Sequence, residues 1–311
     1  MDMLKDWDNS HTSKFQKETF TFRHNLNQSG LFTDEALIKL MSKHPSHMTD
    51  VCSMGDKDHP EYPNKFRTGD FRDTEPAALL AAAKAGRVWI NLRKAMNLHP
   101  EYKTLLDRMY GELADVTKTT AYNANGGILI SSPISQTPYH FDKTETILWH
   151  VRGAKRIYIY PLTQDFISDQ NFESVITQNL EDDLPYNAEF DKHAIVIDLE
   201  EDQAATWPLN SPHRVDNSAF CVSVTTEYST KESSFKNAGM IANATLRKKF
   251  GMNPSWTEDP QPARLAKFVM GKILKATNSE VKTPMTDLVT FKIDPNTPGF
   301  VVDTEPFPRN F

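Results

Sequence analysis

The middle of the chain constrains the fold most, because short apolar segments alternate there with turn-forming residues. Between about residues 121 and 230, β-branched and apolar runs lie at 128–130, 144–151, 156–160, 194–197, 204–207 and 220–228. Gly126-Gly127 leads into the first run, and Arg152-Gly153-Ala154 makes a turn between the second and the third. Many short strands separated by turns are typical of a double sheet or barrel. The sequence therefore predicts a mainly β protein whose core is a double sheet or a barrel.

Helical patterns precede this β zone. Apolar periodicity and capping residues predict helices over about 33–41, 74–85 and 100–113. Thr33 and residues 73–75 are the predicted caps of the first two helices. Residues 88–90 fit a strand that joins a larger sheet. Residues 1–120 are therefore expected to be an extension that packs on the core.

The core and the C-terminal part complete three predicted zones. Residues 121–230 form the β core, and within it residues 161–192 are an acidic, Asn/Gln-rich insertion, expected to form a helix and a loop at the barrel mouth. Residues 231–311 form a C-terminal helical extension and tail. Helices are expected there near 240–250 and 261–276, with an extended tail over 289–311.

Charge and composition narrow the function classes. The net charge of −6 argues against broad nucleic-acid binding, which relies on clustered Lys and Arg. The N-terminus is polar without an apolar secretory region, and no segment has the length and apolarity of a membrane span. Cys52 and Cys221 are too few for a disulfide framework and are expected to be buried as small hydrophobes. We expect a soluble, cytoplasmic protein.

His140 and Asp142 are the first candidate metal ligands. They lie between two strand-like runs, and residues i and i+2 of a strand point to the same face, so both side chains can converge on one ion. His213 follows a later β segment, where two prolines rigidify its approach. Two histidines and one carboxylate form a facial triad that leaves adjacent positions open on Fe(II).

A His-x-acid triplet alone is a weak signal. With 10 His and 41 acidic residues in 311 positions, about one is expected by chance. His59-Pro60-Glu61 and His99-Pro100-Glu101 also fit, but each has a central proline and lies outside the β zone. Of the other histidines, His150 could face the barrel interior beside the metal site or pack as an ordinary core residue. His193 is expected at the surface.

Lys155 distinguishes the His140 region from these other triplets. It begins a strand in which Ile157 and Ile159 share its face. An ammonium on an apolar interior face requires an anionic partner. The distal carboxylate of 2-oxoglutarate is a suitable partner, to which Thr137 could add a hydroxyl donor. The alternative is a surface lysine at a hairpin turn.

These residues resemble a known family. The segments 137–142, 153–156 and 160–161 are similar to the cupin-like branch of the JmjC oxygenases, whose best-known member is the asparaginyl hydroxylase acting on hypoxia-inducible factor. The resemblance covers roughly residues 121–230 and implies a double-stranded β-helix core of the cupin or jelly-roll type, flanked by N- and C-terminal helices. It also implies iron ligands and cosubstrate contacts. The implied iron ligands are His140, Asp142 and His213. The implied contacts to the distal carboxylate of the cosubstrate are Lys155 and Thr137.

The chain departs from this pattern at two points. Thr146 stands where the asparaginyl hydroxylase has an amide near the cosubstrate, and we expect Thr146 to contact the cosubstrate here. The segment before His213 reads Asn-Ser-Pro-His instead of an aromatic-rich stretch. These departures concern the cosubstrate contacts and the prime substrate more than the metal.

The expected function is an Fe(II)- and 2-oxoglutarate-dependent oxygenase that uses O₂ to hydroxylate or demethylate an unidentified peptide or small molecule. One alternative is a metal cupin that acts as an isomerase or dioxygenase without 2-oxoglutarate. Another is a cupin-like sensor or regulator without turnover.

Two sequence features bear on partners. The insertion contains acidic residues that could attract a basic peptide or simply face solvent: Asp165, Asp169, Glu173, Glu181, Asp182 and Asp183. In the last helix, Leu265, Phe268, Val269 and Ile273 form an apolar stripe at helical spacing. This stripe is consistent either with a homodimer through the C-terminal helices or with packing onto the chain's own barrel.

Overall fold

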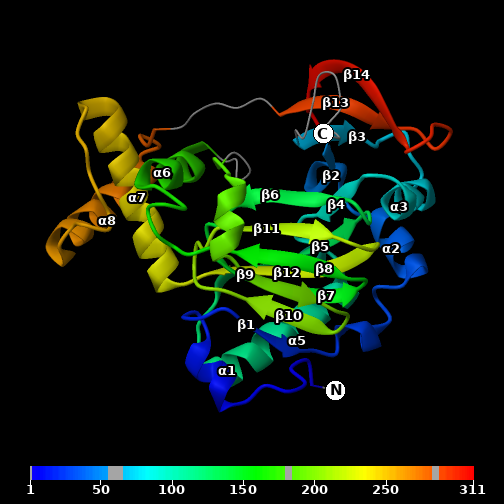
Figure 1. The fold of residues 1–311 in the computed structure, drawn as a ribbon, viewed down its shortest axis with the longest axis horizontal. Coiled ribbons are helices and arrows are strands. Elements are labelled where there is room, and N and C mark those ends of the chain that lie inside the picture. The colour runs from blue at the N-terminus through cyan, green and yellow to red at the C-terminus, as the bar shows by residue number, and fades with distance from the viewer. Residues whose placement is uncertain (1, 55–65, 179–183, 282–286) are drawn as a thin grey trace.

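Two β-sheets and the helices around them make up the protein (Figure 1). The computed structural model describes residues 2–54, 66–178, 184–281 and 287–311. The larger sheet has ten strands in the order β1-β10-β7-β12-β5-β4-β2-β3-β13-β14, and the smaller has four in the order β6-β11-β8-β9.

The strands of the larger sheet are β1 (Phe20–Arg23), β2 (Thr49–Met54), β3 (Phe66–Asp70), β4 (Trp89–Leu92), β5 (Tyr122–Ser131), β7 (Glu145–Arg152), β10 (Gln203–Thr206), β12 (Cys221–Ser229), β13 (Leu288–Ile293) and β14 (Val301–Pro308). Those of the smaller sheet are β6 (Gln136–His140), β8 (Lys155–Ile159), β9 (Ile195–Leu199) and β11 (His213–Asn217). The helices are α1 (Asn9–Lys14), α2 (Asp34–Met41), α3 (Pro76–Ala85), α4 (Ala95–Leu98), α5 (Pro100–Thr117), α6 (Asp169–Gln178), α7 (Lys231–Phe250) and α8 (Gln261–Ala276), with short 3₁₀ turns η1 (Leu26–Ser29), η2 (Ser46–Met48) and η3 (Ala188–His193).

The smaller sheet faces β7, β10 and β12 of the larger one across an apolar interior (Figure 1). The side chains buried between them are Leu148, Ile157, Ile159, Leu199, Ala205, Trp207 and Val215. The predicted fold class is confirmed: the protein is mainly β, with a jelly-roll core and helices added from both ends of the chain. None of the helices in the described ranges is long and apolar enough to cross a lipid bilayer.

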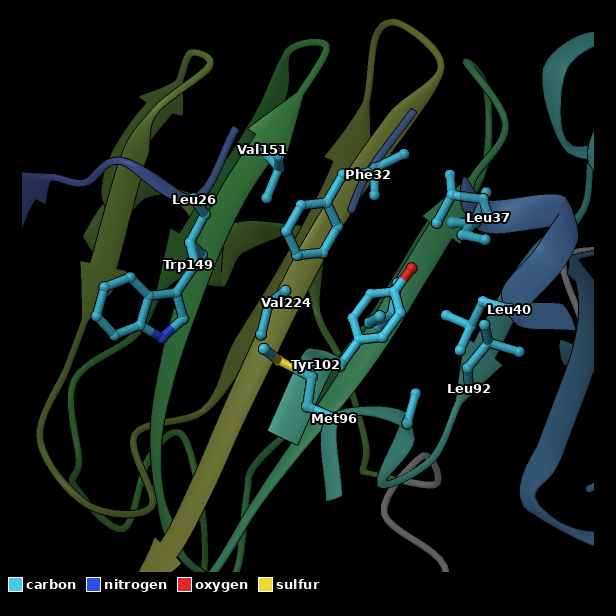
Figure 2. Close-up of a cluster of buried hydrophobic side chains, with 14 of the residues drawn as sticks. Leu26, Phe32, Leu37, Leu40, Leu92, Met96, Tyr102, Trp149, Val151 and Val224 are labelled. Atoms are coloured by element: carbon cyan, nitrogen blue, oxygen red, sulfur yellow. The ribbon is translucent and has the colours of Figure 1, made fainter. Parts of the chain in front are cut away.

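The outer face of the larger sheet packs against the N-terminal part of the chain. Along β7, Trp149 and Val151 point away from the barrel interior, and Val224 of β12 joins them (Figure 2). The residues that cover them, labelled in Figure 2, are Leu26, Phe32, Leu37, Leu40, Leu92, Met96 and Tyr102. Alternate residues of β7 are covered by opposite layers, so nearly the whole strand is buried and its apolar residues lie on both faces.

Most of the predicted N-terminal elements form. The Thr33 side chain accepts a hydrogen bond from the Ala36 amide at 3.2 Å and caps α2. The predicted strand over 88–90 is β4, which pairs with β5. Glu75, within the predicted capping segment, takes the cap position of α3, and Pro76 begins the helix with a preset φ. The Glu75 side chain itself makes no capping hydrogen bond.

Two predictions for the C-terminal zone are corrected by the structure. Helix α7 begins at Lys231, not near residue 240, because Thr230 and Ser233 form a reciprocal cap with hydrogen bonds of 3.1 and 2.8 Å. Serine replaces the usual Glu or Gln at the third helical position, so the signal is weak in the sequence. The predicted extended tail is instead the hairpin β13–β14, and β13 pairs in parallel with β3.

The β13–β3 pair is fastened by buried contacts. The Arg67 guanidinium donates to the Thr290 carbonyl at 2.8 Å and pairs with Asp303 at 2.6 Å. The Phe291 ring lies 2.3 Å from the position that a Cβ on Gly69 would occupy, so only glycine fits there.

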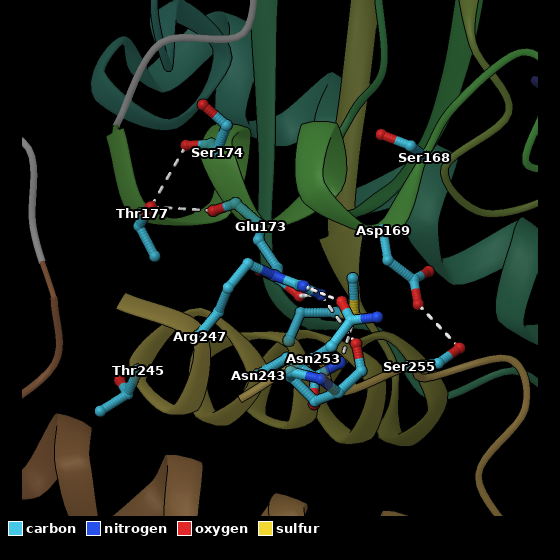
Figure 3. Close-up of polar contacts among 12 residues, drawn as sticks. Ser168, Asp169, Glu173, Ser174, Thr177, Asn243, Thr245, Arg247, Asn253 and Ser255 are labelled. Carbon is cyan, nitrogen blue, oxygen red and sulfur yellow. Dashed lines mark hydrogen bonds and ion pairs between the residues drawn. The ribbon is translucent and has the colours of Figure 1, made fainter. Parts of the chain in front are cut away.

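Helices α6 and α7 are joined by polar contacts (Figure 3). The Arg247 guanidinium pairs with the buried Glu173 carboxylate at 2.9 Å. Asp169 accepts hydrogen bonds from the Ser255 hydroxyl at 3.1 Å and the Trp256 amide at 2.8 Å. These two acids of the insertion therefore hold helices together and are not part of an exposed basic-peptide site. The residues 181–183 of the same insertion lie outside the described residues.

The burial of His24 makes the stability of the folded protein depend on pH. His24 is fully buried; its Nε2 donates to the His150 carbonyl at 3.0 Å and its Nδ1 accepts from the Leu26 amide at 3.2 Å. Burial lowers the pKa of His24 to about 4, so the folded state favours the neutral ring. The unfolded chain, with a histidine pKa of about 6.5, binds this proton first. The neutral His24 ring therefore makes its full contribution to the free energy of unfolding above pH 6.5. This contribution is lost as the pH falls toward 4.

We expect the His24→Gln variant to lose less stability on acidification than the wild type. The His24 share of the loss between pH 7 and pH 5 is about 2 kcal/mol by proton linkage. Urea unfolding at the two pH values measures it, and an exposed histidine gives the matched control, since His193→Gln should keep the full wild-type loss. Equal losses in the wild type and in His24→Gln would contradict the assignment.

Candidate metal centre

His140, Asp142 and His213 lie together at one end of the smaller sheet. His140 ends β6, His213 begins β11, and the two are paired directly across the strands with ring centroids 4.2 Å apart. The Asp142 carboxylate lies 4.0 Å from His140 Nε2 and 3.7 Å from His213 Nε2. Ligand atoms about 2.1 Å from one ion lie roughly 3–4.2 Å apart, so the arrangement suits a single ion. No other group of three such side chains forms among the described residues.

Backbone carbonyls select the histidine tautomers. His140 Nδ1 donates to the Pro138 carbonyl at 2.8 Å, and His213 Nδ1 donates to the Ser211 carbonyl at 3.0 Å. A carbonyl only accepts, so the proton of each neutral ring is on Nδ1 and Nε2 keeps its lone pair. Both lone pairs belong to the atoms nearest Asp142. Such hydrogen bonds orient metal-binding histidines and increase their basicity.

Asp142 is not placed by strand geometry. It lies two residues past His140, beyond the end of β6, so the expectation that strand alternation brings the two together is wrong for Asp142. Two asparagines hold this loop instead: Asn210 donates to the Asp142 carbonyl at 2.8 Å and Asn237 of α7 donates to the Lys143 carbonyl at 2.7 Å. Asn210 has φ +64°, in the left-handed region that asparagine tolerates.

The electrostatics of the cluster fit a bound cation. The Asp142 Oδ2 atom is buried and accepts no hydrogen bond from the residues that the structure describes. Burial, with a smaller contribution from the nearby His140 ring, lowers the pKa of His213 to about 4, although Asp142 opposes the shift. His213 is therefore neutral near pH 7, the state that binds metals. Two imidazole nitrogens and an unpaired carboxylate oxygen are the donor set expected for Fe(II) in a facial triad.

Lys155 lies on the smaller sheet as well, at the end that is farther from the metal cluster. It begins β8 with only 5% of its surface exposed, and Ile157 and Ile159 are buried on its face. Ile159 is paired with His213, so Lys155 and the metal cluster are about 13 Å apart along β8, at about 3.3 Å per residue. The alternative of a surface lysine is wrong.

The Lys155 ammonium makes no hydrogen bond or ion pair within the described part of the chain, and burial lowers its pKa. A buried cation without an anionic partner is costly. The interior therefore contains a buried ammonium without an anionic partner among the described residues. The apolar side chains of Ile157 and Ile159 lie between this ammonium and the metal donors.

The two threonines predicted to contact the cosubstrate lie on strands of different sheets. Thr137 of β6 is paired with Val215, whose side chain belongs to the interior, and is half-buried. Thr146 of β7 is buried on the same face as Leu148, which also points into the interior. Both threonines thus line the space between the sheets.

The rival His-x-Glu triplet that the structure describes, His99 to Glu101, is not part of this cluster. His99 precedes α5 and its Nε2 lies 3.1 Å from Nδ1 of His44, while Glu101 pairs with Lys39 on the surface. The triplet over 59–61 lies outside the described residues. His193 is exposed at the end of η3, as expected.

Sequence reasoning missed the two asparagines. Asn210 could have been suspected from its place in the Asn-Ser-Pro-His approach to His213. Asn237 lies inside a helix at a position that no local pattern marks.

No protein-family model and no curated protein sequence matches the chain. Solved structures of the ribosomal oxygenase YcfD from Escherichia coli do match it. A YcfD complex with cobalt and 2-oxoglutarate has a TM-score of 0.51 and 14% identity, covering 89% of this chain and 68% of that one. A second YcfD structure has a TM-score of 0.51 and 15% identity, with 89% and 70% covered. A third has a TM-score of 0.50 and 13% identity, with 93% and 75% covered.

At these identities the likeness concerns the fold, while the finer resemblance to the asparaginyl hydroxylase stays a prediction. The chain has the fold of a 2-oxoglutarate-binding ribosomal oxygenase, with a His-Asp-His cluster at one end of its smaller sheet.

Proposed function

We propose that this protein is an Fe(II)- and 2-oxoglutarate-dependent oxygenase. The observation that carries the proposal is the pairing of two features on one buried wall: the His140-Asp142-His213 cluster and the partnerless ammonium of Lys155. A ligand that binds a metal at one end and carries a carboxylate at the other satisfies both. 2-Oxoglutarate is such a ligand, and the YcfD structure of the same fold contains cobalt and 2-oxoglutarate.

In this proposal His140, Asp142 and His213 hold Fe(II) through two Nε2 atoms and a carboxylate, which leaves adjacent coordination positions open. When bound, the iron with 2-oxoglutarate and O₂ supplies the oxidising chemistry that hydroxylates a C–H bond; demethylation follows from hydroxylation of an N-methyl carbon. The carbonyls of Pro138 and Ser211 keep both Nδ1 atoms protonated, so that the Nε2 lone pairs stay available.

The other residues bind and orient the cosubstrate. Lys155 pairs with its distal carboxylate, the Thr137 hydroxyl donates toward the same group from β6, and Thr146 contacts the cosubstrate from β7. Ile157, Ile159 and neighbouring apolar side chains keep water away from this ion pair and so strengthen it.

Anaerobic titration of the Fe(II)-loaded protein with 2-oxoglutarate tests the proposal. We expect a metal-to-ligand absorption band that saturates below millimolar 2-oxoglutarate, and succinate release on addition of O₂ and a substrate. Metal binding without such a band at millimolar 2-oxoglutarate would reject the oxygenase and favour a metal cupin that works without 2-oxoglutarate. A band without succinate release in any screen would favour a sensor.

The prime substrate is proposed to be a protein. The support is the name of the solved relative, a ribosomal oxygenase, which makes ribosomal proteins the first substrates to screen. Mass spectrometry of treated ribosomal proteins distinguishes a gain of one oxygen from the loss of a methyl group.

A homodimer through α8 is a further part of the proposal. Leu265, Val269 and Ile273 are 55%, 49% and 58% exposed along one side of α8, whereas Phe268 turns inward, with its ring 5.2 Å from that of Phe235. Packing of the whole stripe onto the chain's own barrel is therefore wrong for the three exposed residues. An exposed apolar helix face of this kind is typical of an interaction surface.

We expect light scattering to give about 71 kDa at tens of micromolar protein, twice the chain mass of 35.4 kDa. Val269→Asp should give the monomer mass, because an aspartate at the centre of the stripe would be desolvated in the interface. Lys275→Asp, an exposed charge change on the same helix, should leave the mass unchanged. A wild-type monomer at this concentration rejects the dimer.

A further inference from the structure

A second polar group lies in the barrel interior near Lys155. His150 of β7 is fully buried and shares the inward face of Thr146 and Leu148. Its Nδ1 atom lies 3.0 Å from the Ser223 hydroxyl, directly across the strand pair with β12. Its Nε2 atom is buried and has no hydrogen-bond partner in the parts of the chain that the structure describes. Unpaired buried polar atoms are rare in native proteins and call for a ligand or water.

The tautomer of His150 follows from its neighbours. The Ser223 hydroxyl makes no other hydrogen bond to a described residue, so we assign its proton to the hydrogen bond with Nδ1. The ring proton then lies on Nε2, which is a donor without an acceptor. Burial, with a smaller contribution from the Lys155 charge, lowers the pKa of His150 to about 3, so the ring is neutral near pH 7.

His150 and Lys155 face each other from opposite sheets. The turn at residues 152–154 joins β7 to β8, so the two side chains enter the interior close to the same turn. Cys221, two positions before Ser223 on β12, contacts the Ala154 carbonyl at 3.2 Å and interacts electrostatically with Lys155. This end of the interior therefore presents an ammonium and a ring N–H group that has no hydrogen-bond partner among the described residues, although the Gly153 carbonyl lies near the ring.

We propose that His150 is a second anchor for the distal carboxylate of the cosubstrate, donating from Nε2 to one carboxylate oxygen while Lys155 pairs with the group. This inference rests on the proposed 2-oxoglutarate dependence. One dianionic ligand would then supply the acceptor for both buried donors. Ser223 would act only by setting the tautomer of the ring.

Binding affinities in the anaerobic Fe(II) protein test this role. His150→Phe removes the donor and keeps an aromatic ring in the space. Because hydrogen bonds to charged groups are among the strongest, we expect 2-oxoglutarate to bind about 10- to 100-fold more weakly. 2-Oxopentanoate has the same chain length without the distal carboxylate, and its affinity should change less than about twofold. His150→Gln, which can place an amide N–H near the Nε2 position, should restore most of the loss.

The ratio of the two affinities separates a carboxylate anchor from a merely structural residue. A fold defect would weaken both ligands together, whereas a lost anchor weakens only the diacid. If the wild type binds 2-oxoglutarate and His150→Phe binds it equally well, the His150 inference is overturned and the oxygenase proposal stands. If the wild type binds no 2-oxoglutarate, the oxygenase proposal itself fails.

A second measurement needs no variant. In the Zn(II)-loaded wild type, nitrogen NMR should show the buried His150 ring with its proton on Nε2. Adding 2-oxoglutarate should move the Nε2 proton resonance downfield, and adding 2-oxopentanoate should not. A proton on Nδ1, or a resonance that does not respond to the diacid, overturns the inference.

Discussion

Replacing Lys155 with Ala is expected to weaken 2-oxoglutarate binding at least a hundredfold without reducing the metal content. Lys155 is buried and has no partner among the described residues, so the distal carboxylate would lose its only cationic partner in a shielded site. Breaking a buried charge pair costs about 3–5 kcal/mol, or roughly two to three and a half decades of affinity. Lys155→Arg should rescue poorly, because a longer planar fork does not replace a compact ammonium.

The absorption titration used for the wild type also measures this loss, and metal analysis of the same samples shows that iron is retained. Lys192→Ala is a matched control, since Lys192 is exposed and pairs only with Glu189. It should leave the affinity unchanged. Undiminished binding by Lys155→Ala would remove Lys155 from the cosubstrate site.

Replacing His213 with Ala is expected to lower the affinity for Fe(II) at least about 100-fold. Changing a residue that merely supports a ligand already costs 10–100-fold, and His213 is one of the three donors themselves. The remaining pair, His140 and Asp142, provides only two donors. Metal analysis after desalting, and the spectrum of the Co(II)-substituted protein, both measure the effect.

His193→Ala is the control for this second prediction, because it removes an exposed imidazole outside the cluster. One metal ion per chain should remain in it, as in the wild type. Thermal unfolding of the metal-free proteins shows whether His213→Ala still folds. Unchanged stoichiometry and affinity in a folded His213→Ala protein would exclude His213 as a ligand.

Local pattern was enough to predict the strands that carry the site. Strand β7 is buried along nearly its whole length because helices cover one of its faces and the smaller sheet covers the other. Alternation placed Lys155 on the face of Ile157 and Ile159, and the structure buries all three. These features can be predicted because alternate residues of a strand point to opposite faces, so the pattern of apolar residues shows which face is buried.

The sequence did not predict the features that depend on contacts between distant segments of the chain. The loop at Asp142 is held by Asn210 and Asn237, which lie 68 and 94 residues from the carbonyls they contact. The hairpin β13–β14 was predicted as an extended tail because Pro306 and Pro308 weaken the strand signal, although an edge strand tolerates proline. No local rule identifies a partner that only the tertiary fold supplies.

Because β13 pairs in parallel with β3, one edge of the larger sheet forms late in folding. Arg67 on β3 contacts Thr290, which is synthesised 223 residues later. Contacts of such long sequence separation form slowly because the chain must first close a large loop. Until then β3 has an unpaired edge, to which strands of other chains can add. Aggregation therefore competes with folding mainly in the interval before this last hairpin docks.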